Sequence, residues 1–137
     1  MKECKQIWEE NGVKAFFTEV NSPYPMSNRV FLDFMYTFEE KDGSFFALNS
    51  SLGNERIPQE VFDKLELDGK VVGFNNIVGN YFRPWKSEDG LILGTEVFHL
   101  NNVNLEGLIP GWLVDQFGLA TLIEQVATMA ELAANEC

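Results

Sequence analysis

Most of the chain consists of short apolar runs separated by turn-forming residues, a pattern that predicts β-strands. The sequence KDGS at 41–44 lies between two such runs, and its Asp-Gly pair supplies the positive φ angles of a tight hairpin turn. The segment 53–69 reads as a polar connection with one helical turn around Val61–Leu65. Gly73 and Gly79 predict a bulge or a close backbone approach in the strand that contains them. The predicted strands are 13–20, 29–40, 45–52, 70–85 and 91–103.

The segment that follows Pro110 has a different period. Its apolar residues recur at helical spacing, and Pro110 suits the first turn of a helix. The stripe consists of Leu119, Leu122, Ile123, Val126, Met129, Ala130 and Ala133. One face of this helix must lie on something apolar, and the only large candidate is the sheet. The sequence therefore predicts an α+β fold, in which a long C-terminal helix lies across an antiparallel meander.

The strand at 29–40 is apolar on both of its faces. Val30, Leu32 and Phe34 lie on one face, and Phe31 and Met35 lie on the other. An antiparallel sheet with one face in water alternates more clearly than this. We therefore expect a cover on each side of the strand, and a bound apolar ligand could form part of one cover.

Composition and charge narrow the function. The 137 residues suit a single domain, and 45% are hydrophobic, which is enough for a sizeable core. The net charge of −11 argues against a nucleic-acid partner and against standing attachment to anionic membranes, although brief membrane contact remains compatible with it. Cys4 and Cys137 read as two unrelated thiols. The charged N-terminal sequence is unlike a signal peptide, and no apolar run has the length of a membrane span, so we expect a cytoplasmic protein.

Catalytic, metal and cofactor motifs are weak. His99 is the only histidine, and no nucleophile elbow accompanies it. One histidine and two distant cysteines do not make a metal-ligand set, and the glycines of GFNNIVGN do not match a phosphate-binding loop. We therefore expect a protein that is not an enzyme and that has no cofactor.

Asp33 interrupts the apolar strand, where its carboxyl must be solvated, paired or kept neutral. It could lie at a rim with access to water, or it could anchor the polar end of a ligand in an apolar cavity. Arg29 lies on the same side of the strand but about 13 Å away, so that a direct pair between the two is not expected.

Aromatic residues and the loop SPYPMS each allow two interpretations. Phenylalanines occur in every predicted strand, where they could form an ordinary core or line a tunnel. The loop could be a rigid turn set by its prolines, or a gate in which Tyr24 and Met26 offer adaptable apolar contacts. The phenylalanines concerned are Phe16, Phe17, Phe31, Phe45, Phe46, Phe74, Phe82 and Phe98.

Four segments, in order, resemble START lipid-transfer domains. PYPMSNRVF resembles the proline-containing loop, arginine and aromatic strand of that family, and KDGSFFALNSSLGNERIP resembles its next hairpin and exit loop. GKVVGFNNIVGNYF is similar to the following strand, and LEGLIPGWLVDQFG to the approach to the C-terminal helix. The match runs from about Phe16 to about Ala133, and the family's N-terminal helices and first strands have no counterpart.

The resemblance implies a helix-grip fold, in which a curved antiparallel sheet holds one lipid beneath a C-terminal helix. It implies a single START-like domain over residues 1–137 and a movable lid made of the helix and the gate loop Pro23, Tyr24, Pro25 and Met26. The implied ligand-binding residues are Arg29, Phe31, Asp33, Met35, Phe74, Asn76, Trp112, Phe117, Leu119 and Ile123. The missing N-terminal part implies an open sheet edge, and a homodimer could pair along it.

The resemblance implies one bound lipid, which could be a sterol, a fatty acid or a phospholipid, and phosphatidylcholine is not favoured among them. The aromatic residues that hold choline in the phosphatidylcholine carrier of the family fall at Thr18, Phe31 and Asn76, and cation–π capture needs several aromatic faces. A sterol, a fatty acid or a single-chain lipid fits at least as well, with Asp33 or Asn76 at its polar end. Two alternatives remain: an interaction module without a ligand, and an enzyme whose acid–base pair would be Asp33 and His99.

Overall fold

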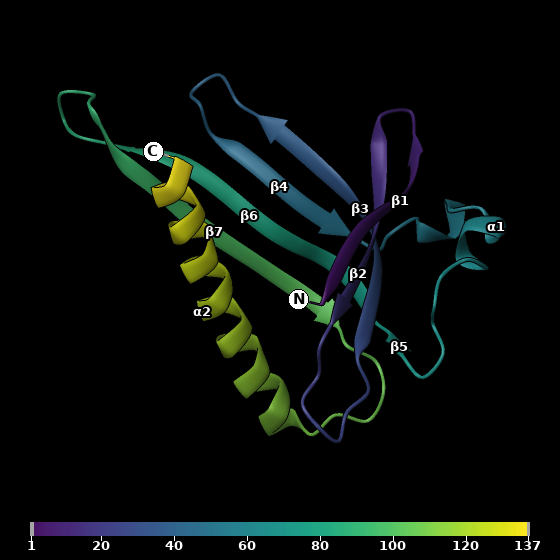
Figure 1. Cartoon of the computed structure of the whole chain (residues 1–137). Helices are drawn as coiled ribbons and strands as arrows, with labels where there is room; N and C mark the ends of the chain where they lie inside the picture. The colour runs from purple at the N-terminus through teal and green to yellow at the C-terminus, as the bar shows by residue number, and fades with distance from the viewer. Residues whose placement is uncertain (1, 137) are drawn as a thin grey trace. The chain divides into compact units, whose positions relative to one another are not determined.

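The structure, a computed structural model, describes residues 2–136 (Figure 1). It divides into two compact units, one that ends at Glu106 and one that begins at Gly107, and each is described by itself. The prediction of one START-like domain over 1–137 stays a prediction. Within the second unit, five side chains lie outside the described part: those of Phe117, Thr121, Gln125, Ala133 and Glu136.

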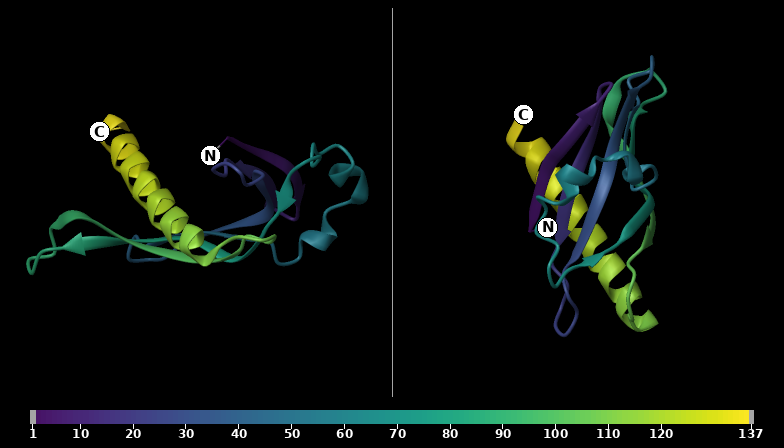
Figure 2. Two further views of the ribbon diagram at one scale, coloured as in Figure 1. Left: turned by 90° about the horizontal axis from the view of Figure 1, so that it is seen from below. Right: turned by 90° about the vertical axis from the view of Figure 1, so that its right-hand side faces the viewer.

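The first unit is a seven-stranded sheet with the order β1-β2-β3-β4-β6-β7. Neighbours in this order pair antiparallel, and β5 pairs in parallel with the start of β3. Figure 2 shows that the sheet is strongly curved between β6 and β1. The predicted meander is confirmed. The strands are β1 Glu3–Glu10, β2 Val13–Val20, β3 Arg29–Glu39, β4 Phe45–Ser50, β5 Val71–Val72, β6 Phe74–Lys86 and β7 Ile92–Asn104.

Strand β1 was not predicted. Its sequence ECKQIWEE carries four charged residues, so that it lacks a clear alternation of apolar and polar positions. It nevertheless pairs with β2 over its whole length, and Trp8 contacts Phe34 at a ring-centroid distance of 6.1 Å. An edge strand exposes one side of its backbone, and charged side chains along it discourage further pairing.

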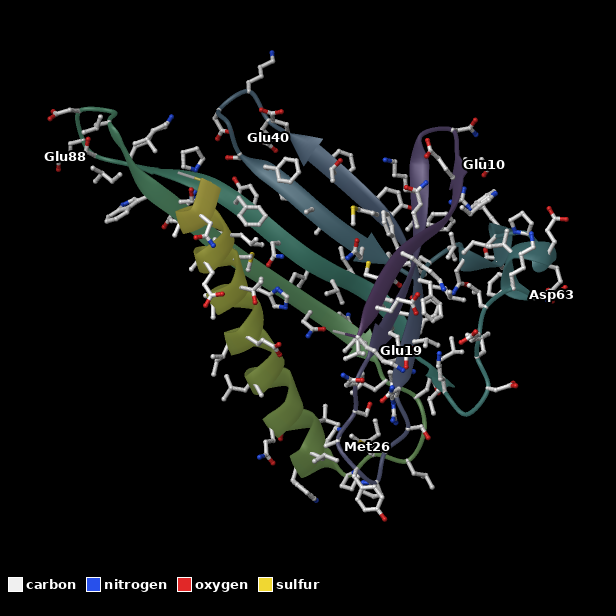
Figure 3. The ribbon with its side chains drawn as sticks, in the orientation of Figure 1. Glu10, Glu19, Met26, Glu40, Asp63 and Glu88 are labelled. Carbon is white, nitrogen blue, oxygen red and sulfur yellow. The ribbon has the colours of Figure 1, made fainter. Side chains whose placement is uncertain are left out.

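The hairpin turn predicted at 41–44 is confirmed. Gly43 has a φ of 86°, and the backbone N–H of Glu40 donates to the carbonyl of Ser44 at 2.8 Å. The Asp42 carboxylate accepts the N–H of Ser44, and this bond lowers the pKa of Asp42. Glu40 at this turn, Glu10 and Glu88 all lie at hairpin ends, whereas the β2–β3 loop with Met26 lies at the opposite end of β2 and β3 (Figure 3).

The two faces of β3 have different neighbours. The Phe34 face, which carries Val30, Leu32, Phe34, Tyr36 and Phe38, holds the core: Ala15, Phe17 and Ile57 pack with the first three of these residues. The segment 51–70 covers this face with the short helices η1 Asn54–Arg56 and α1 Gln59–Phe62. That segment was expected to be polar, but its Ile57 is 3% exposed. The Asp33 face carries Arg29, Phe31, Asp33, Met35 and Thr37.

Gly79 allows β4 and β6 to approach each other. A Cβ at Gly79 would lie 2.2 Å from the carbonyl oxygen of Ala47 and 2.8 Å from the Cα of Leu48. The close backbone approach predicted for this glycine is confirmed. The irregularity of β6 lies elsewhere, between Asn75 and Ile77, where two residues oppose one on β7.

The second unit consists of residues 107–137, whose described helix is α2 Gly111–Glu136. The carbonyl of Pro110 accepts the backbone N–H of Leu113 at 2.9 Å, so that this proline directly precedes the helix. The long C-terminal helix expected from the sequence is confirmed. No helix among residues 2–136 is long and apolar enough to cross a membrane.

Candidate ligand-binding site

Four of the predicted site residues lie side by side on the Asp33 face of β3. Arg29, Phe31 and Asp33 are 5%, 6% and 5% exposed, and Met35 is 37% exposed. Burial on this face, together with the core on the Phe34 face, explains why the strand is apolar on both sides. The Asp33 face therefore changes from closed to open between Asp33 and Met35.

The guanidinium of Arg29 binds three backbone carbonyls. Its Nη1 donates to Ser27, its Nε donates to Leu105 at 3.3 Å, and its Nη2 donates to Glu106 at 3.2 Å. Charged donors of this kind make stronger hydrogen bonds than neutral ones. Arg29 therefore fastens the start of β3 to the chain that follows β7.

Asp33 belongs to a buried polar network with Ser51 and Asn75. The Ser51 hydroxyl donates to Oδ1 of Asp33, and Nδ2 of Asn75 donates to Oδ2 at 2.6 Å. The backbone N–H of Asn75 in turn donates to Oγ of Ser51 at 2.9 Å. Burial raises the pKa of Asp33, and the two hydrogen bonds counteract this only in part. The rim position considered for Asp33 is wrong, because the residue is buried.

Phe31 owes its position to Gly73. A Cβ at Gly73 would lie 2.4 Å from Cε1 of Phe31, so that only a glycine leaves room for this ring. Met35 is paired with Asn49 of β4 on the same face. The neighbouring pairs on this face place Asn80 next to His99, and their side chains hydrogen bond at 2.9 Å.

Phe74 and Asn76 do not join these residues, which corrects the expectation that all would line one site. Asn75 is paired with Val103 on the Asp33 face, so the adjacent Phe74 points to the other face. Asn76 is exposed at the bulge, and its Nδ2 donates to Oδ1 of Asn102 at 3.1 Å. The amide that reaches Asp33 is Asn75, which the sequence interpretation overlooked together with Ser51.

The gate loop is uncharged and fastened at its base. Tyr24 is 97% exposed, Pro25 is exposed, and Pro23 and Met26 are half-buried. The side chain of Asn28 accepts the N–H of Ser22 at 3.2 Å and donates to Oε1 of Glu19 at 2.7 Å.

Glu19 supports this base from β2. It is 1% exposed, and it binds the ammonium groups of Lys2 and Lys70, each at 3.0 Å. Hydrogen bonds from Asn28, Lys2 and Lys70 lower the pKa of Glu19 to about 2. This buried carboxylate was also overlooked, because a glutamate in the run VKAFFTEV reads as a solvent-facing residue.

The helical candidates lie in the second unit. Trp112, Leu119 and Ile123 are spaced by seven and four residues, so they share one side of α2. The side chain of Phe117 lies outside the described residues.

Acid–base and metal chemistry find little support in the part of the chain that is described. His99 and Asp33 hydrogen bond to different partners, Asn80 for the former and Ser51 and Asn75 for the latter. Residues 2–136 contain no group of three or more His, Cys, Asp or Glu side chains that could hold a metal ion.

Comparisons with known proteins support the fold assignment. No model of a known protein family matches the chain, and no curated protein sequence matches it significantly. Among solved structures, human StAR-related lipid transfer protein 5 is similar, with a TM-score of 0.71 and 19% sequence identity. The match covers 92% of this chain but only 56% of that chain, so this chain spans little more than half of that protein. At this identity the likeness shows the fold alone: the described residues have the curved antiparallel sheet and the C-terminal helix that occur in the helix-grip fold of START domains.

Proposed function

We propose that this chain binds a lipid and transfers it between membranes, without catalysing a reaction. The observation that carries this proposal is the START fold, matched over 92% of the chain to a protein named for lipid transfer. The change from buried to exposed residues along the Asp33 face supports a lipid-binding site on this part of the sheet. A cytoplasmic location, expected from the sequence, stays a prediction.

Apolar contact provides most of the binding energy in this proposal. Phe31 and Met35 supply the apolar surface on the sheet, and buried apolar area is worth about 25 cal/mol per Å² before the cost of ordering the ligand. Trp112, Phe117, Leu119 and Ile123 of the helix complete the predicted set of lining residues. Their role, and that of the helix as a lid, stays a prediction.

Hydrogen bonding favours an uncharged polar end on the lipid. Arg29 gives three of its five N–H donors to backbone carbonyls and is 5% exposed, so it is not held ready for a phosphate or a carboxylate. A carboxyl has acceptor sites beyond the two that Ser51 and Asn75 use, so Asp33 can accept a ligand hydroxyl. Thr18 and Phe31 are paired on the same face, and one aromatic ring there does not make a cage for choline. A sterol or another lipid with a hydroxyl group fits these residues best.

The gate loop supports transient contact with membranes. Residues 21–28 carry no charge, whereas Glu10, Glu40 and Glu88 lie at other hairpin ends (Figure 3). Because the net charge is −11, an uncharged loop is where the chain approaches an anionic bilayer at least cost. We propose that Tyr24, Pro25 and Met26 touch the membrane when lipid enters or leaves.

A charge placed on the Asp33 face tests the site. Met35→Arg puts a cation among the proposed lining residues, and we expect it to abolish uptake of a fluorescent sterol from vesicles while thermal unfolding changes little. Phe38→Arg is the matched control, because Phe38 is 56% exposed on the opposite face of the same strand. Uptake that is equal in the two folded variants would show that the ligand does not lie against Met35.

A second candidate is an interaction module without a ligand. The match covers only 56% of the similar solved chain. Native mass spectrometry of the purified protein separates the two candidates. Co-purifying lipid supports the carrier, and a ligand-free protein that takes up no sterol supports the interaction module.

A further inference from the structure

The sheet has two edge strands of different character. Within residues 2–136, β1 and β7 end the strand order, so each presents one side of its backbone without a strand beside it. Unpaired edges invite association with another strand, and proteins usually protect them with charges or irregularities. The two edges are therefore worth comparing.

The β1 edge is protected. Its eight residues include Glu3, Lys5, Glu9 and Glu10, and its register is irregular between Gln6 and Trp8. Pairing two copies of this strand would bring several carboxylates together. Like charges on directly opposed residues destabilise strand pairing.

The β7 edge has little protection. It is 13 residues long, and its one irregularity, at Leu93, lies next to its first residue. It has neither lysine nor proline, and its only acidic residue, Glu96, is bound by Arg83 at 2.6 Å. Val97, Phe98 and Leu100 are 45%, 47% and 49% exposed. A long, nearly neutral edge with exposed apolar side chains is the type that pairs with another chain.

The direction of the free backbone groups on β7 follows from Asn75. Both the N–H and the C=O of Asn75 bond to Ser51, so they point toward β4 and away from its partner Val103 on β7. In an antiparallel pair, two opposed residues either both direct their N–H and C=O groups at each other or both direct them away from each other. Val103, and with it His99 and Val97 at alternate positions, therefore directs its N–H and C=O outward.

We propose that β7 pairs antiparallel with β7 of a second copy of this chain. A two-fold axis at Phe98, the middle residue of β7, opposes residues 94–102 of the two copies, a stretch that excludes the irregularity at Leu93. It pairs the outward groups of Val97 with those of His99 in the partner. The second copy is favoured over another protein because this register opposes no like charges: Glu96, the one carboxylate of β7, lies opposite Leu100 of the partner and is neutralised by Arg83.

Analytical ultracentrifugation of the full chain, in reducing buffer so that Cys4 stays free, tests this proposal. We expect a dimer of twice 15.6 kDa. Because each copy carries a net charge of −11, we expect the dimer to strengthen as salt rises and screens the repulsion. A protein that stays monomeric over a wide range of concentration and salt overturns the proposal.

Variants identify the edge. Val97→Pro removes one outward N–H from each copy and leaves the β6–β7 bonds intact, so we expect dimerisation to weaken about tenfold or more. Val97→Lys gives a second test if the proline variant does not fold, and Cys4→Lys adds the same charge to the β1 edge as its control. A dimer that Cys4→Lys dissociates and the Val97 variants do not would place the contact at β1 and contradict the proposal.

Discussion

The network of Asp33, Ser51 and Asn75 makes a quantitative prediction about stability. In Asp33→Ala the Ser51 hydroxyl and the Asn75 amide lose their shared acceptor, and these residues are 0% and 8% exposed, so water does not readily replace it. Each buried donor left without a partner costs about 1–3 kcal/mol, and removal of a buried carboxyl returns part of this cost. We expect Asp33→Ala to lower the free energy of unfolding by about 2–4 kcal/mol.

Asp33→Asn separates the shape of the side chain from its charge. The asparagine can keep both bonds if the Asn75 amide turns over and offers its oxygen, so we expect a smaller loss than for the alanine variant. The pH dependence has a definite sign. The folded-state pKa of Asp33 is raised above 3.8. The stabilisation that protonated Asp33 gives the folded wild type is therefore complete below pH 3.8, and it is lost as the pH rises through the raised pKa. Asparagine does not titrate, so the advantage of the wild type over Asp33→Asn should shrink as the pH rises.

Urea unfolding followed by tryptophan fluorescence, at a series of pH values from about 4 to about 8, measures both effects. Other titrating groups act equally in the two proteins, so their contributions cancel in the difference. A difference that grows with pH would mean that Asp33 is stabilised as a charged group in the folded state. An alanine variant as stable as the wild type would show that the network contributes nothing to folding.

Two further predictions concern other parts of the sheet. Gly79→Ala presses a methyl group against the backbone of Ala47, so we expect it to cost about 3 kcal/mol in urea unfolding. Gly94→Ala is its control, because its Cβ meets no atom closer than 3.6 Å, and equal stability of the two variants would refute the close approach. Glu19→Gln should lower stability at neutral pH, and the difference from wild type should shrink below pH 4.5 and vanish near pH 2, because the pKa of Glu19 is lowered from 4.5 to about 2. A difference that stays constant through this range, followed by circular dichroism, would contradict that pKa.

Local signals in the sequence predicted most of the fold. The Asp-Gly turn, the apolar run that forms β3 and the helical period after Pro110 each depend on neighbours a few residues apart, and all three are confirmed. Strand β1 escaped prediction because its stability comes from pairing with β2 and from packing of Trp8 on Phe34, which charged flanking residues obscure.

The site was less predictable because it depends on register between distant strands. A bulge after Asn75 turns this residue toward Asp33 and leaves Asn76 exposed, so a shift of one residue decided which amide belongs to the network. Likewise, no residue near Arg29 in the sequence indicates that its hydrogen-bond partners include carbonyls 76 and 77 residues away. Contacts between residues so far apart in the sequence are seen only in the three-dimensional structure.

Arg29 also connects two segments that are far apart in the sequence. Its guanidinium holds Leu105 and Glu106, the last residues of the first unit, and the second unit begins at Gly107. Gly107 has a φ of 78°, a conformation that a glycine adopts without strain. The same guanidinium binds Ser27 at the end of the β2–β3 loop. One side chain thus holds the end of the β2–β3 loop and the end of the first unit, and its loss would release both together.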